Sequence, residues 1–131
     1  MGFTEAPRRA EKIRRMQRAV ERLEVKAEGG AIQYKEHVQS SNLQDPSDYI
    51  VLAADMQREI DKETAILEQE KAEARAFAAS LSDPIDRCII LLRFDKLKPM
   101  GEVADAIGFD LRYTRKRKSR ILRKKTSQDR P

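Results

Sequence analysis

Apolar residues recur along the chain at alternating intervals of three and four positions, the spacing that places them on one face of a helix. The first such stretch covers residues 7–28, and the pair Gly29-Gly30 is expected to end it. A stripe this narrow is typical of a heptad seam between packed helices. The seam positions are Ile13, Met16, Val20, Leu23 and Ala27.

A longer stretch with the same spacing runs from residue 46 to residue 81. Asp45 and Pro46 open it with a capping carboxylate and a proline suited to the first helical turn. The pattern predicts a helix about 50 Å long. Its repeating positions are Ala53, Met56, Ile60, Glu63, Leu67, Glu70, Ala74, Phe77 and Leu81.

An apolar stripe of this length has to be covered. We expect the first helix to fold back on the second as an antiparallel hairpin, and the uncovered remainder to form a homodimer. Glu63 and Glu70 are expected to meet Lys or Arg of a partner helix. The alternative is an intramolecular bundle with the chain's own helix 84–94. The predicted oligomer interface comprises Met56, Ile60, Leu67 and Phe77.

The last third of the chain changes its pattern. Val103 and Ile107 lie one helical turn apart, Gly108 breaks the spacing, and Asp110 can cap a second helix. A helix, a tight turn and a helix form the layout that places a second helix in a DNA major groove.

Charge singles out the second of these helices, because 111–128 holds nine basic residues and no acidic one. Like charges at this density repel one another, so a polyanionic partner is the natural explanation. A solvated basic tail is the alternative, and the turn just before it argues against a mere tail. The nine residues are Arg112, Arg115, Lys116, Arg117, Lys118, Arg120, Arg123, Lys124 and Lys125.

These patterns together predict an all-α fold. A long antiparallel helical hairpin or coiled coil would occupy 1–81, with frayed residues 1–6 and an irregular loop at 29–46. A helix-turn-helix domain would follow in 82–125, and a flexible tail in 126–131.

Residues 82–125 resemble region 4 of sigma-70-type transcription initiation factors, especially small phage and prophage proteins that carry such a domain behind a helical amino-terminal part. The resemblance implies double-stranded DNA binding and a contact with RNA polymerase. The matching residues are Leu81, Pro84, the run 87–94, Glu102-Val103-Ala104, Ile107-Gly108-Phe109 and the run 120–124.

The same resemblance implies how the basic helix is anchored. Thr114 and Arg117 stand where that family usually turns branched apolar residues inward. Thr114 would therefore offer its methyl group, and Arg117 would snorkel or lie at an edge. Leu111, Ile121 and Leu122 would anchor the helix.

Helical phase divides the polar residues of this helix by role. The predicted base readers face the groove, and the predicted phosphate contacts set the register. The base readers are Arg112, Tyr113, Lys116 and Lys118. The phosphate contacts are Arg115, Arg120, Arg123, Lys124 and Lys125.

The expected function is sequence-specific DNA binding by a bacterial or phage transcription regulator, a sigma-like accessory factor. A phage DNA-packaging small subunit, or another structural DNA-binding protein, would use the same ingredients and would be favoured by a ring-forming oligomer. A coiled-coil adaptor whose basic tail binds RNA or acidic protein is a third interpretation. The turn ending at Phe109 argues against it, since a tail needs no turn.

Catalysis, cofactors and metals are not expected. The sequence has no Gly-rich phosphate loop, CxxC or HExxH motif, and its one histidine, His37, lies far from its one cysteine, Cys88. We expect Cys88 to be a small core residue in a reducing compartment. No apolar run is long enough to span a bilayer. The expected location is the cytoplasm, at the nucleoid.

Overall fold

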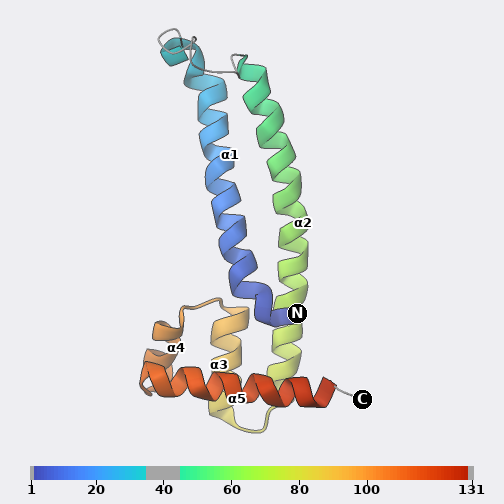
Figure 1. Cartoon of the computed structure of the whole chain (residues 1–131), viewed down its shortest axis with the longest axis vertical. Coiled ribbons are helices and arrows are strands. Elements are labelled where there is room, and N and C mark those ends of the chain that lie inside the picture. Colours follow the sequence, from blue (N-terminus) through green and yellow to red (C-terminus); the bar gives the residue numbers. More distant parts are fainter. Residues whose placement is uncertain (1, 35–44, 130–131) are drawn as a thin grey trace. The chain divides into compact units, whose positions relative to one another are not determined.

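The computed structural model describes residues 2–34 and 45–129, and the regular elements within these ranges are all helices (Figure 1). The predicted all-α class is thereby confirmed. The elements are η1 (Gly2–Glu5), α1 (Ala6–Tyr34), α2 (Pro46–Ala79), α3 (Pro84–Ile90), η3 (Leu91–Asp95), α4 (Met100–Ile107) and α5 (Leu111–Asp129).

The chain divides into two compact units. One comprises residues 9–66, and the other comprises the amino-terminal residues up to Arg8 together with 67–131. The predicted boundary at residue 81 differs from this division. The reason is that Ala74 and Ala78, from the last turns of α2, belong to the same core as the helices that follow.

Within the unit 9–66, α1 and α2 run antiparallel. Arg9 donates a hydrogen bond to Glu63 at 2.7 Å, and near the other end of the pair the Lys26 ammonium lies 5.9 Å from the centroid of the Tyr49 ring. Glu63, which we expected to meet a partner helix, thus meets a cation of its own chain. The buried residues of this unit are Ala10, Ile13, Val20, Tyr49, Ala53 and Ile60.

Helix α1 is longer than predicted. It continues through Gly29-Gly30 to Tyr34, so the prediction of a loop at 29–46 is wrong for its first six residues. Each glycine costs about 1 kcal/mol relative to Ala, but extending a formed helix requires no new nucleus. The rest of that loop, up to residue 44, lies outside the described residues, and so does His37.

Helix α5 also exceeds its predicted length. It runs to Asp129, so the expectation of a flexible tail from residue 126 is wrong as far as that residue. Residues 130 and 131 lie outside the described part of the chain.

The second unit is built around an aromatic residue near the amino terminus. Phe3 is fully buried within η1, so the expectation that residues 1–6 fray is wrong for residues 2–6, and Met1 lies outside the described residues. Its ring centroid lies 5.3 Å from that of Phe77 and 5.1 Å from that of Phe94. Burying a large aromatic side chain offsets the entropy lost in ordering η1. The buried core residues are Phe3, Ala74, Ala78, Ile89, Ile90, Phe94, Met100, Val103 and Ile121.

The helices between α2 and α5 are fixed by two carboxylates. Asp83 accepts the backbone N–H of Ile85 at 2.8 Å and so caps α3. Asp95, at the end of the π-helical turn η3, is buried and accepts a hydrogen bond from Arg75 of α2 at 2.7 Å. Because a buried carboxylate needs such a partner, this pair ties η3 to α2.

Candidate nucleic-acid interface

Helix α5 begins directly after a tight turn. Gly108 ends α4 in the left-handed conformation, with a φ of 78°, and its N–H donates to the carbonyl oxygen of Ala104 at 3.0 Å. Asp110 then caps α5, because its carboxylate accepts the N–H of Tyr113 at 2.7 Å. Only three residues separate the two helices, so the direction of α5 is set by local backbone geometry.

The inner face of α5 packs on α3 and α4. Thr114 is fully buried and its hydroxyl donates to the backbone carbonyl of Asp110 at 2.8 Å. Ile121, two turns further along, belongs to the core. Leu111, which we expected to anchor the helix, is instead exposed. Leu111 is the first residue of α5, and because helical side chains lean toward the amino terminus, the side chain of a first residue extends past the end of the helix.

Arg117 is held by two carboxylates at the start of α3. Its Nε donates to Asp86 at 2.6 Å and its Nη2 donates to Asp83 at 2.7 Å. The Asp86 hydrogen bond raises the pKa of Arg117 above its ordinary value. The Ile85 N–H and the Arg117 charge together lower the pKa of Asp83. Arg117, with a side chain only 11% exposed, is therefore a link between α5 and α3 rather than a phosphate ligand.

Two further cations of α5 lie over aromatic rings. The Lys118 ammonium is 6.0 Å from the ring centroid of Phe94, and the Lys125 ammonium is 5.5 Å from that of Phe3. Burial lowers the pKa of Lys118, and the neighbouring charges of Arg93 and Arg115 lower it further. Lys118 was predicted to face the groove, and its position on the side of Phe94 contradicts that.

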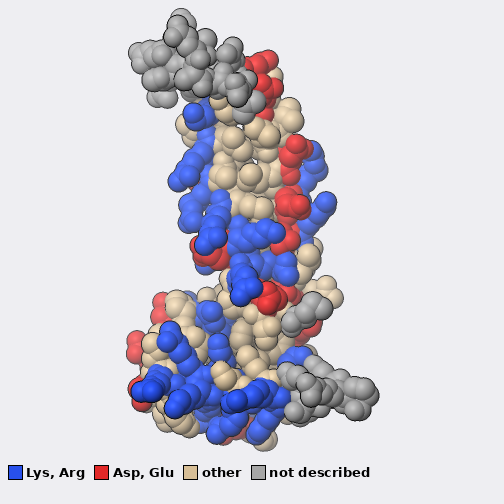
Figure 2. Space-filling view, viewed as in Figure 1, with Lys and Arg blue, Asp and Glu red and all other residues tan. Residues whose placement is uncertain are grey.

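The other six cations of α5 are exposed, and in Figure 2 basic side chains gather along this helix. Among the described side chains, none of the six forms an ion pair with a carboxylate. At 3.6 residues per turn, Arg112, Lys116 and Arg123 lie opposite Thr114 and Ile121. The six exposed cations are Arg112, Arg115, Lys116, Arg120, Arg123 and Lys124.

An aromatic pair stands at the amino-terminal end of this surface. Tyr113 is 41% exposed and Phe109 is 39% exposed, and their ring centroids lie 5.2 Å apart. The Tyr113 hydroxyl accepts a hydrogen bond from Nη1 of Arg117 at 3.3 Å. Tyr113 is thus positioned by the same residue that ties α5 to α3. It also lines a shallow hollow with Arg115, Lys116, Arg117, Ser119, Arg120 and Arg123.

The residues predicted to form an oligomer interface lie in different surroundings. Ile60 and Leu67 are buried within one chain, and Phe77 stacks on Phe3. Met56 lines an open hollow between α1 and α2. Three of these four side chains are therefore covered by contacts within a single chain.

Cys88 is exposed, so the expectation that it is a core residue is wrong. Ile89 and Ile90 occupy the inner face of α3 instead. Among the described side chains, no three His, Cys, Asp or Glu residues gather closely enough to hold a metal ion. Within the same residues, no helix combines the length and the apolar character needed to cross a membrane.

No family model, curated protein or solved structure matches this chain. The resemblance of residues 82–125 to sigma region 4 therefore stays a prediction made from the sequence.

The sequence reasoning missed the partners of Arg117 and the burial of Phe3. A signal for the first was present, because an arginine at an inward helical position requires a buried or half-buried carboxylate. Asp83 and Asp86 stand at the start of α3, more than thirty positions before Arg117 in the sequence. No comparable signal marked Phe3, a single aromatic residue outside any repeat.

Proposed function

We propose that this protein binds double-stranded DNA through α5, with α4, the Gly108 turn and α5 acting as a helix-turn-helix. The observation that carries the proposal is the exposed row of six cations on α5, which have no carboxylate partner among the described side chains. Phosphates of a duplex would relieve the repulsion within this row. The cap at Asp110 and the buried Thr114 support the proposal, since they fix the helix that would enter the groove.

Roles within the helix follow from its phase. Arg112 and Lys116, opposite the core, are the proposed base readers, with Tyr113 beside them at the amino-terminal end. Arg123 shares their side of the helix and would contact the groove or its edge. Arg115, Arg120 and Lys124, on the flanks, would contact phosphates. Lys118 and Lys125 are proposed to hold α5 on its aromatic neighbours and to add only general positive charge.

The biological role that this surface fits best is a sigma-like accessory regulator of transcription. The resemblance of residues 82–125 to sigma region 4 suggests RNA polymerase as a further partner. Support for the role comes from that resemblance, and support for DNA binding comes from the geometry of α5. The two parts of the proposal can therefore fail separately.

The test is selection of bound duplexes from a random pool by the intact protein. We expect a recurring sequence motif for the unchanged protein, and its loss when Arg112→Ala and Lys116→Ala are combined. The matched control combines Arg14→Ala and Arg18→Ala on α1, where both arginines lie within 4.0 Å of Glu11. This control removes the same charge and should leave the motif intact. Recovery of no motif, or its loss in both variants, would contradict base reading by α5.

A genome-wide recovery of bound DNA would then separate regulation from packaging. Enrichment at promoters, lost in the α5 variant, is the result expected for a regulator. Enrichment at one terminal site of a viral genome would instead indicate a packaging role.

A further inference from the structure

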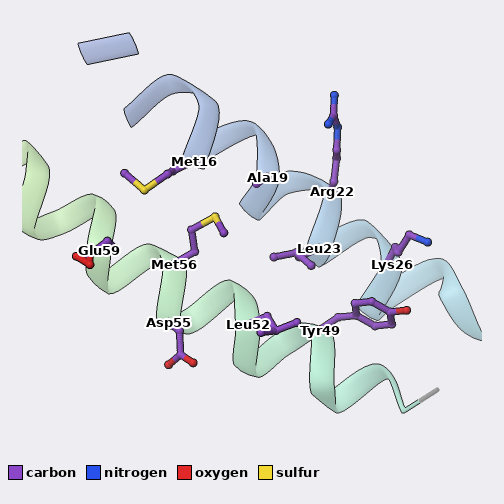
Figure 3. A pocket seen from close by; sticks show the side chains of 10 residues that line it. All are labelled: Met16, Ala19, Arg22, Leu23, Lys26, Tyr49, Leu52, Asp55, Met56 and Glu59. Carbon is purple, nitrogen blue, oxygen red and sulfur yellow. The ribbon is translucent and has the colours of Figure 1, made fainter. Parts of the chain in front are cut away.

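An open apolar hollow runs between α1 and α2 inside the unit 9–66 (Figure 3). Met16 and Leu23 of α1 face Met56, Leu52 and Tyr49 of α2 across it. Leu52 is 40% exposed, and the lining is predominantly apolar. Each helix of a pair packs against one neighbour only, and its apolar stripe is wider than that contact. One side of each stripe therefore remains in contact with water.

The two rims of this hollow carry opposite charge. Arg22 and Lys26 stand on the α1 rim, and Asp55 and Glu59 stand on the α2 rim. In Figure 3 the Arg22 and Asp55 side chains leave the hollow on opposite sides. Arg58 also forms an ion pair with Asp55. Both side chains are exposed and lie one helical turn apart, so the pair is weak and a cation from another molecule can take the place of Arg58.

We propose that the hollow is covered by the same hollow of a second copy of this chain, giving an antiparallel four-helix homodimer. The occupant is identified by charge. A two-fold axis parallel to the helices sets α1 of one copy against α2 of the other, so each basic rim meets an acidic rim. It also makes every neighbouring helix pair antiparallel, which is favourable for the helix dipoles.

The register within one chain fixes which residues meet. Lys26 lies over Tyr49, so in antiparallel helices Arg22 is level with Ala53. An axis parallel to the helices keeps residues at their level. Arg22 of one copy therefore lies two residues, about 3 Å along the axis, from the level of Asp55 of the other copy. An arginine side chain reaches across this offset.

The alternative two-fold arrangement is disfavoured by the same charges. An axis across the helices would set α1 against α1 and α2 against α2. Arg22 and Lys26 would then face their own copies, and so would Asp55 and Glu59. Like charges facing each other weaken an interface, so this arrangement is the one the rims disfavour.

The sharpest test uses two full-length charge-reversed variants. One combines Asp55→Lys with Glu59→Lys, and the other combines Arg22→Glu with Lys26→Glu. Each variant alone places like charges on facing rims, so its dimer dissociation constant should rise by about 100-fold. Mixed together, the two should form a heterodimer, which native mass spectrometry distinguishes from either homodimer. Heterodimer formation also shows that both variants are folded.

A second test uses the apolar lining. Leu52→Glu should dissociate the dimer in sedimentation velocity, because it puts a carboxylate in the covered hollow. Val51→Glu is the matched control, since Val51 is 57% exposed and lies outside the hollow. Ile50→Glu probes the other side of the hairpin, where Ile50 lines a separate hollow with Val20 and Ala53.

Several results would overturn the proposal. An unchanged protein that sediments as a monomer over about a 100-fold range of concentration would do so, since a dimer must respond to mass action. So would variants that dimerise as well alone as when mixed, or an Ile50 variant that dissociates while the Leu52 variant does not. The proposal does not rest on DNA binding, and none of these measurements involves DNA.

Discussion

Helices α1 and α5 both carry long rows of arginine and lysine, but their charges are compensated very differently. On α1, Arg14, Arg15 and Arg18 lie 2.5, 3.7 and 3.9 Å from the Glu11 carboxylate. On α5, Arg117 pairs with Asp83 and Asp86. The six outward cations of α5 have no carboxylate partner among the described side chains. The number of cations that lack a carboxylate partner therefore identifies a binding surface better than the density of basic residues does.

The difference is visible in the carboxylates as well. The hydrogen bond from Arg14, with the charges of Arg15 and Arg18, lowers the pKa of Glu11. One acidic residue thus serves three cations on α1. On α5 the segment 111–128 offers no acidic residue at all.

The largest expected effect tests the core on which α5 rests. Phe3→Ala should lower the free energy of unfolding by about 3–5 kcal/mol, because it removes a fully buried ring between Phe77 and Phe94. The matched change on α1 is Val25→Ala, at a side chain 67% exposed, and it should cost less than about 0.5 kcal/mol. Urea unfolding measures both. Equal costs would mean that η1 does not anchor this unit.

The next effect tests Arg117, the cation of α5 that pairs with Asp83 and Asp86. Arg117→Met should cost about 1–3 kcal/mol, because it strands Asp83 and Asp86 without their partner while keeping an apolar stem. Arg14→Met, in an exposed pair on α1, should cost no more than about 0.5 kcal/mol. If the Arg117 variant proves as stable as the Arg14 variant, the link between α5 and α3 is not structural.

A smaller effect separates the outward from the inward cations of α5. Lys116→Ala should weaken duplex DNA binding about tenfold, because this ammonium stands on the outer face. Lys118→Met should weaken it less, since Lys118 lies over Phe94 and the methionine keeps that contact. Fluorescence anisotropy with one labelled duplex measures both. A larger loss for Lys118 would reverse the assignment of the two faces.

The smallest effect is on pH dependence. The pKa of Asp83 is lower in the folded chain than its ordinary value of 3.8. Its contribution to stability is therefore complete above pH 3.8 and is lost as the pH falls through the lowered value. Asp83→Asn should flatten the acid limb of the unfolding curve. An unchanged acid limb would show that the cap and the Arg117 pair do not matter there.

The sequence predicted those parts of the fold that depend on local pattern. The α2 helix, the break at Gly108 and the caps at Asp45 and Asp110 all follow from residue types at fixed positions, and the structure confirms them. The continuation of α1 through Gly29-Gly30 could not be predicted, because propensity is a weak signal once a helix has formed.

For the candidate site, the sequence identified the helix and its basic composition but not which cations are available. Thr114 faces inward as the resemblance implied. Lys118 was placed on the wrong side, although it stands four residues after Thr114 and so shares its inward face, where the structure puts it over Phe94. The pairing of Arg117 depends on residues more than thirty positions away, and only packing brings them together.

The most direct measurement is the salt dependence of duplex binding. If the six outward cations of α5 engage about six phosphates, the logarithm of affinity should fall with the logarithm of salt at a slope near −5. Combining Arg112→Ala, Lys116→Ala and Arg123→Ala should reduce the slope to about −3. Removing Arg14, Arg15 and Arg18 from α1 should leave it near −5. A slope near zero for the unchanged protein, or the same reduction in both variants, would contradict DNA binding by α5.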